Sequence, residues 1–266
     1  MGNIVLATPA LSDAGTITAG AEESANPATN LLTLQPGEVW QTPALASIFV
    51  ELDLGSAQTI NLVALLGHNG TDAATWRVRS ATSQANLTAS PTRDTGNVSM
   101  FPITRPSDWT VLHSIDWNST GESARWWRVD MIDAANPDSK FRAGRLYVAN
   151  AWQPTVNIVE GWSLGWLDPS PRQLAIGGQM YPLTRNPRRV VNFALRFQTE
   201  DQIYNNAFET DRLRGSSKDI LVVRDPDATT HLHRQTVYGL ISDLRPIVNP
   251  NVGLFEKLYR VQELLA

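Results

Sequence analysis

Five residues in predicted loops of the N-terminal half have side chains suited to binding a sugar: Trp40, His68, Asn69, Trp109 and Trp117. A sugar presents apolar C–H faces, which aromatic rings can cover, and hydroxyl groups, which Asn and His side chains can hydrogen-bond. The sequence therefore predicts a carbohydrate-binding site built from these loops. The alternative for the tryptophans, Trp40 above all, is a place at the rim of a hydrophobic core.

Two pairs of titratable residues could carry other chemistry. His231 and His233 are two residues apart, would share one face of a strand and could ligate a metal, but no third ligand is evident nearby. Glu51 and Asp53 also share a predicted strand face, and paired carboxylates can cleave a glycosidic bond. Two carboxylates placed in this way more commonly face solvent or bind neighbouring backbone.

Motifs of the common enzyme classes are absent from the sequence. The chain has no Gly-x-Ser-x-Gly, no phosphate-binding loop and no His-Glu-x-x-His. It also has no cysteine, which removes thiol catalysis and thiolate metal sites. We therefore predict that the protein is not an enzyme, has no catalytic residue and holds no metal or cofactor.

The elements that would position the sugar-binding candidates read as β-strands. Residues 48–55 alternate apolar and polar side chains, which predicts a half-buried strand that ends at Gly55. Trp127, Val129 and Met131 share one face of another strand. The strands predicted in the N-terminal half lie at 48–54, 60–66, 76–80 and 125–131. No helical period separates the first three, so we expect an antiparallel β domain.

The second half of the chain has strands and one helix. Thr199 is placed to cap that helix, with Gln202 three residues on, and Gly215 ends it. The C-terminal segment 254–265 fits either a helix or a strand, and a strand is favoured because the sheet needs a partner. The other predicted strands are 173–176, 180–183, 190–197, 219–223 and 237–241.

Several short motifs occur in a recognisable order. They are Asn30-Leu31-Leu32, Trp40, Leu52-Asp53-Leu54-Gly55, the Arg-aromatic stretch 125–129 and Gly144-Arg145-Leu146-Tyr147-Val148. In this order they resemble the galactose-binding-like, or discoidin, jelly roll. The resemblance covers residues 24–150 and implies two packed antiparallel sheets. It makes Trp40, His68 and Asn69 the best ligand candidates and leaves a Ca²⁺ site unassigned. The absence of cysteine argues against a secreted animal-type module.

The second half resembles the small β domain of tailed-phage tail and baseplate proteins. The likeness lies in the element order and in the segments 217–223 and 238–241. The predicted fold is mainly β: an N-terminal antiparallel jelly-roll β-sandwich and a C-terminal β-sandwich or barrel domain with one helix. The predicted divisions are an N-terminal strand or arm at 1–23, the jelly roll at 24–150, a linker at 151–155 and the tail-type domain at 156–266.

Charge and composition exclude some partners. The chain of 266 residues has a formal charge of −4, with −5 in residues 1–155 and +1 in 156–266, so neither half has the basic excess that nucleic-acid binding requires. The first residues lack the pattern of a signal peptide, and no apolar run approaches the length of a membrane span.

These observations together predict a virion structural protein of a phage tail tip or baseplate, such as a minor or distal tail protein. It is made in the host cytoplasm, forms a homo-oligomeric ring and contacts other tail or baseplate proteins. Attachment to host-surface carbohydrate is left open as a second role. The alternative is a carbohydrate-binding module of a free bacterial protein or of a glycan-acting enzyme.

Overall fold

The computed structural model describes residues 2–101, 112–158 and 161–265, and these form two compact units. The first unit contains residues 2–153 and 221–236, and the second contains 154–220 and 237–265. The strands pair antiparallel, which confirms the predicted mainly-β class. Residues 221–236, which the sequence analysis assigned to the C-terminal domain, belong to the first unit.

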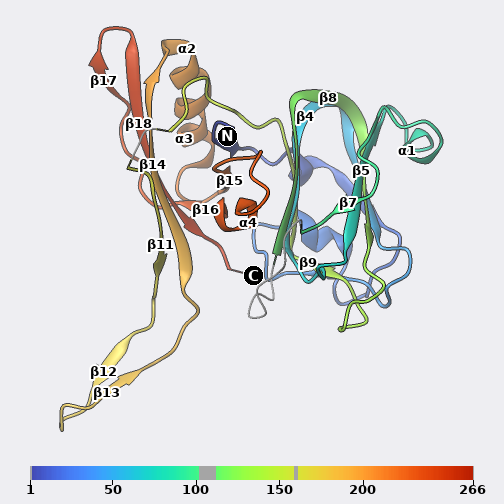
Figure 1. Ribbon diagram of the computed structural model, residues 1–266, viewed down its shortest axis with the longest axis horizontal. Helices are drawn as coiled ribbons and strands as arrows, with labels where there is room; N and C mark the ends of the chain where they lie inside the picture. The colour runs from blue at the N-terminus through green and yellow to red at the C-terminus, as the bar shows by residue number, and fades with distance from the viewer. Residues whose placement is uncertain (1, 102–111, 159–160, 266) are drawn as a thin grey trace. The chain divides into compact units, whose positions relative to one another are not determined.

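The first unit is built on two long strands, β4 (Phe49–His68) and β8 (Leu112–Ile132), which pair along most of their length. The strand predicted to end at Gly55 continues through it. Gly55 has a φ of +76°, and the β4–β8 register shifts between Asp53 and Gln58. Glycine tolerates this backbone conformation, so the strand bends without ending. The bend lets β4 and β8 contribute to both layers of a sandwich (Figure 1).

Shorter strands complete the two layers. β2 (Thr16–Ala19) pairs with the first half of β4, and β10 (Arg145–Ala149) pairs with its second half. β5 (Thr75–Ala81) lies beside the C-terminal half of β8. The remaining elements of the first unit are β1 (Val5–Ala7), η1 (Leu11–Ala14), η2 (Ala28–Leu32), β3 (Trp40–Gln41), α1 (Asn86–Ala89), β6 (Arg93–Asp94), β7 (Val98–Ser99), β9 (Arg142–Ala143), α4 (Leu232–Gln235) and the end of β15 (Asp219–Val223) that pairs with β1.

The core of the first unit lies between the two layers. Trp127, Val129 and Met131 point into it, which confirms the face predicted for their strand. Val63 and Leu146 reach the same cluster from the opposite layer. Because side chains alternate along a strand, the intervening residues at the start of β4, in β5 and at the end of β8 form an outer face, on which Glu51 and Arg79 are buried and Arg128 and Asp130 are partly exposed.

The second unit contains a sheet with the strand order β16 (Thr236–Ile241), β18 (Leu254–Glu263), β14 (Arg188–Gln198) and β11 (Ser163–Leu167). β17 (Val248–Asn251) also pairs with β18. The C-terminal segment is therefore a strand, as favoured from the sequence.

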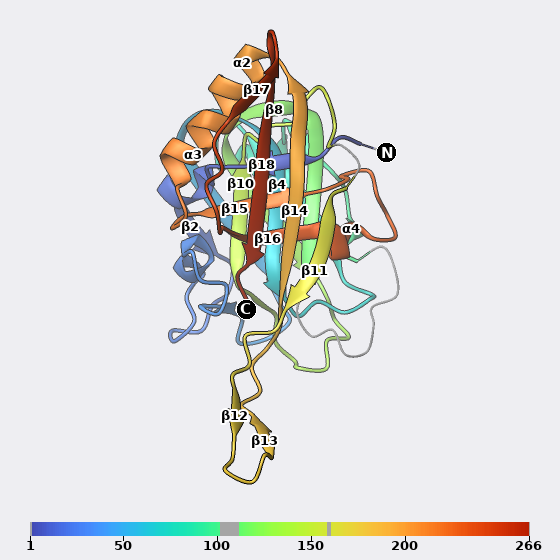
Figure 2. The ribbon, with the colours of Figure 1, turned by 90° about the vertical axis from the view of Figure 1, so that its left-hand side faces the viewer.

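One continuous helix covers one face of this sheet (Figures 1 and 2). It consists of α2 (Glu200–Gln202), the π-helical segment η3 (Ile203–Phe208) and α3 (Glu209–Arg214). Thr199 accepts a hydrogen bond from the Gln202 backbone, and Gly215 follows the last turn, so both predicted ends are confirmed. No helix within the described residues has the length and apolar character to cross a membrane.

A hairpin projects beyond the sheet between β11 and β14 (Figure 2). Its strands are β12 (Arg172–Leu174) and β13 (Met180–Pro182), which pair only with each other. None of the residues 168–187 is buried. We call residues 168–187 the arm.

Candidate functional site

Two of the predicted sugar-binding residues lie inside the first unit. Trp40 is fully buried, its indole Nε1 donates to the carbonyl of Ala21 at 3.2 Å, and its ring packs edge-on against Phe141. His68 is buried at the end of β4, and its ring stacks on the same Phe141 ring. It also shares a hydrogen bond of 2.9 Å with the hydroxyl of Ser114. The structure thus brings Trp40 and His68 together, but away from solvent.

Asn69 is also a structural residue of the loop. Its amide nitrogen donates to the Asp138 carboxylate at 2.8 Å and to the Lys140 carbonyl at 3.0 Å. Its amide oxygen accepts from the backbone of Arg142 at 2.9 Å. These bonds join the segment after β4 to the segment before β9. The side-chain donor and acceptor groups of Asn69 therefore bind the protein itself.

The other two predicted residues are not part of this group. Trp117 lies in strand β8, half-buried and opposite Leu62 of β4, and not in the loop that the sequence indicated. The polar and small residues around Trp117 hide the strand signal, although β8 pairs with β4 along most of its length. Trp109 falls outside the described residues.

The histidine pair does not lie on a strand. His233 is in the short helix α4, where its Nδ1 accepts from the backbone of His113 at 3.2 Å and its ring packs against Phe101. His231 precedes that helix and is exposed, so the two side chains do not share a face. In the part of the chain that the structure describes, no three His, Asp or Glu side chains gather as a metal would require.

The carboxylates of Glu51 and Asp53 are each held by an arginine. Glu51 accepts from Arg128 at 2.7 Å, and Asp53 accepts from Arg125 at 2.6 Å. The hydrogen bond from Arg125 lowers the pKa of Asp53. A general acid needs a raised pKa, so this setting is the opposite of the one that glycosidic hydrolysis would use.

A hollow of about 420 Å³ lies on the outer face of the first unit, and we call it the outer hollow. It is formed by the start of β4, by β5, by the end of β8 and by adjoining loops. Its polar lining includes Arg77, Arg79, Asn97, Arg128 and Asp130, and Leu45 and Ile132 add apolar surface.

Three of these residues form a connected ion-pair cluster. Arg79 donates to Asp130 through Nη2 at 2.6 Å, and Arg128 donates to the same carboxylate through Nε at 2.8 Å. The guanidinium of Arg128 also lies 3.6 Å from the centre of the Phe49 ring. Burial opposes the charge of Arg128, but the hydrogen bonds to Asp130 and Glu51 outweigh it, so its pKa is raised. The hydrogen bonds therefore hold the Arg128 side chain in place on the outer face.

Strand register explains how this cluster forms. Arg79 lies opposite Arg128 across the β5–β8 pair, and Glu51 lies opposite Arg128 across the β4–β8 pair. Cross-strand neighbours on one face are close enough for their side chains to interact. Alternation along β8 puts Arg128 and Asp130 on the face opposite Trp127 and Val129, but it does not show which strands flank them.

An ion pair at the edge of the outer hollow predicts a pH effect. Hydrogen bonding from Arg77 lowers the pKa of Asp94 to about 2. The folded state is therefore stabilised relative to Asp94→Asn above about pH 4, and this advantage is lost as the pH falls towards 2. Both side chains are about a third exposed, so we expect a difference below about 1 kcal/mol. Urea unfolding of both proteins between pH 6 and 2.5 measures it; a constant difference would contradict the assignment.

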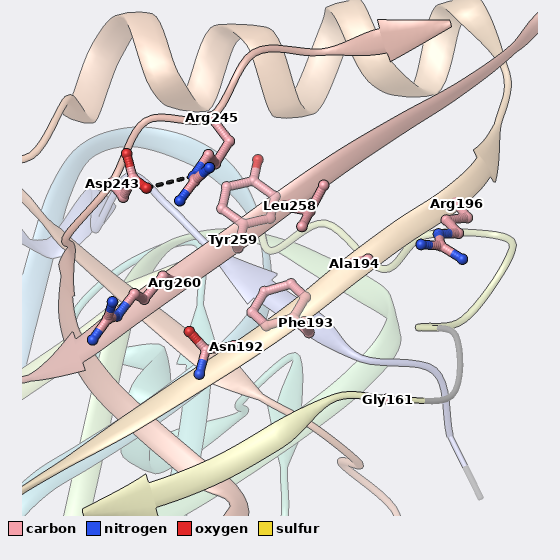
Figure 3. A pocket seen from close by; sticks show the side chains of 10 residues that line it. All are labelled: Gly161, Asn192, Phe193, Ala194, Arg196, Asp243, Arg245, Leu258, Tyr259 and Arg260. Carbon is pink, nitrogen blue, oxygen red and sulfur yellow. Dashed lines mark hydrogen bonds and ion pairs between the residues drawn. The ribbon is translucent and has the colours of Figure 1, made fainter. Parts of the chain in front are cut away.

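A second hollow of about 490 Å³ lies on the second unit (Figure 3). Arg196, Arg245 and Arg260 surround it, and the first two pair with Glu256 and Asp243. This basic surface could bind an anionic group. None of its residues was among the candidates, although the outward placement of Arg196 follows from the alternation along β14.

Solved structures of carbohydrate-binding modules are similar to about half of the chain. One is the family 32 module of Clostridium perfringens NanJ in complex with galactose, with 13% identity and a TM-score of 0.41 over 54% of this chain and 98% of that chain. Another is a chitosan-binding module from Paenibacillus, with 16% identity and a TM-score of 0.39 over 54% and 100%. A third is a fucose-binding module of Streptococcus pneumoniae, with 14% identity and a TM-score of 0.38 over 53% and 94%. No family model and no curated protein matches the chain.

Proposed function

We propose that the first unit binds carbohydrate at the outer hollow. The observation that carries this proposal is the Arg79–Asp130–Arg128 cluster that lines it. Guanidinium groups donate hydrogen bonds and a carboxylate accepts them, so together they can satisfy neighbouring sugar hydroxyls, which do both. Ile132, half-exposed at the edge, offers apolar surface to the C–H groups of the ring.

The same cluster favours binding over catalysis. Asp130 accepts from two arginines, and Glu51 accepts from Arg128 and Gln84. A carboxylate held in this way orients a ligand but is poorly placed to give up or take a proton. We therefore propose a binding module and not a glycan-cleaving enzyme.

Replacing an arginine at the edge of the outer hollow tests this proposal. Arg77→Met keeps the aliphatic stem and removes the guanidinium, so we expect sugar affinity to fall about 10-fold or more, the usual effect of losing a charged hydrogen bond. Calorimetric titration with galactose, fucose and chitosan oligosaccharides measures it, and the modules named above suggest these probes.

Arg125→Met is the matched control. Arg125 is also a part-exposed arginine paired with an aspartate on the same sheet, but it does not line the outer hollow. It should leave affinity unchanged. Equal losses in both variants, or a wild-type protein that binds none of the three probes, would overturn the proposal.

A second candidate function is the structural role in a phage tail tip or baseplate, in which copies of the chain form a ring with other tail proteins. The observation that favours self-association is the arm, which has no buried residue and many apolar ones. A surface of this kind marks an interaction site. Light scattering and negative-stain images of the whole protein test this role: a ring is expected, and a monomer at every concentration would contradict it.

A further inference from the structure

The arm carries apolar side chains that its own chain leaves open to solvent. Leu174, Ile176, Met180, Tyr181 and Leu183 are between 55% and 111% exposed. Leu174 and Met180 lie opposite each other in the hairpin, so their side chains share one face. A two-stranded hairpin has no second layer to bury such residues and is marginally stable alone in water. The arm therefore requires a partner surface.

A second open apolar surface lies on the helix of the same unit. Tyr204 and Phe208 are one turn apart, and each is nearly half exposed. Their rings are 5.9 Å apart, and Tyr204 also packs against Phe255 of β18 at 5.7 Å. We call Tyr204 and Phe208 the aromatic patch; Phe255 is buried beneath it.

The arm and the first turn of the helix, α2, lie at opposite ends of the sheet (Figure 2). Strand β14 begins directly after the arm and leads to the helix at its other end. Its 11 residues span roughly 35 Å at the rise of a strand. The arm also extends away from the sheet, so it cannot fold back onto the patch of its own chain.

The charges of the arm and of the helix beside the aromatic patch are opposite in sign. The arm has two arginines, Arg172 and Arg185, against one acid, Asp168. The helix begins with Glu200 and Asp201, which lie within one turn of Tyr204. An arm that covers the aromatic patch would bring its positive charges close to these carboxylates.

We propose that the arm of one copy docks on the aromatic patch of a second copy. The contact is head-to-tail, because each copy offers a different surface to each neighbour, and it closes into a ring if the rotation permits. Leu174 and Met180 share one face of the arm, and at roughly 100 Å² each they would bury about 200 Å², a quarter of the ~800 Å² that each partner contributes to a standard interface. Met180, on the face that docks, is a side chain that packs well on aromatic rings.

This inference deepens the proposed assembly role and rests on it. Its test uses the whole chain in two complementary variants: an arm variant, Leu174→Ser with Met180→Ser, and a patch variant, Phe208→Ser. All three positions are exposed, so folding should be preserved, which circular dichroism checks. Leu244→Ser, another exposed leucine of the second unit, is the matched control and should oligomerise like the wild type.

Sedimentation velocity measures the outcome. We expect each variant alone to be a monomer, with association weakened at least 100-fold, and an equal mixture of the two to form dimers. The mixture has one intact arm and one intact patch that can meet, but neither surface is left to continue the ring. A mixture that stays monomeric, or an arm variant that still forms wild-type oligomers, overturns the docking inference while the assembly role stands. A wild-type monomer at every concentration overturns both.

Discussion

Replacing Trp40 by alanine is expected to lower the free energy of unfolding by about 3–5 kcal/mol. The side chain is fully buried, packs on Phe141 and donates a hydrogen bond to Ala21, so its removal leaves a large cavity and an unpaired carbonyl. Urea denaturation followed by circular dichroism measures the loss. Sugar binding by the remaining folded protein should be unchanged.

Trp166→Ala is the control for this change. Trp166 is 65% exposed in β11, so its loss should cost about 0.5 kcal/mol or less. If Trp40→Ala were as stable as the wild type but lost its sugar affinity, Trp40 would have to be returned to the binding site.

Replacing Glu263 by alanine is expected to destabilise the second unit by about 3–5 kcal/mol. The Glu263 carboxylate accepts from the Arg189 backbone and from its Nε, both at 2.8 Å, and both side chains are more than 90% buried. Alanine would remove this carboxylate and its hydrogen bonds from the buried guanidinium. The pair joins β18 to the start of β14, at the base of the arm, so the arm should also become more mobile.

Chemical denaturation and limited proteolysis of the arm report this effect. Glu256→Ala is the matched control, since Glu256 also lies in β18 and pairs with an arginine of β14, but Arg196 is half exposed. It should cost about 1 kcal/mol or less. Equal losses of unfolding free energy in the two variants would show that burial of the Arg189–Glu263 pair adds nothing to stability.

Strands and their buried faces could be predicted because alternation is a local signal. The face of Trp127, Val129 and Met131 and the capped helix after Thr199 both follow from residues within one element. The predicted end at Gly55 was wrong for a physical reason. A glycine marks a change in backbone direction, and the sequence does not show whether the strand stops or bends there.

The proposed binding site could not be predicted because it depends on contacts between distant residues. Trp40 is closed off by Phe141, about a hundred residues away, and nothing in the local sequence distinguishes this buried ring from an exposed one. Arg79, Arg128 and Asp130 meet only through the register of β5 with β8. Alternation along β8 puts Arg128 and Asp130 on one face, and the pairing of β5 with β8 brings Arg79 beside them.

The most direct test of the proposed function is a nuclear magnetic resonance titration of the whole protein with galactose, fucose and chitosan oligosaccharides, each to roughly 10 mM. Side-chain N–H signals report separately on the outer hollow and on the loop after β4 that contains Asn69. We expect the signals of the Arg128 Nε–H and the Asn97 amide to shift with at least one sugar, while the signal of the buried Asn69 amide does not. Shifts at Asn69 with none at Arg128 and Asn97 would contradict it and place the ligand at the loops after β4.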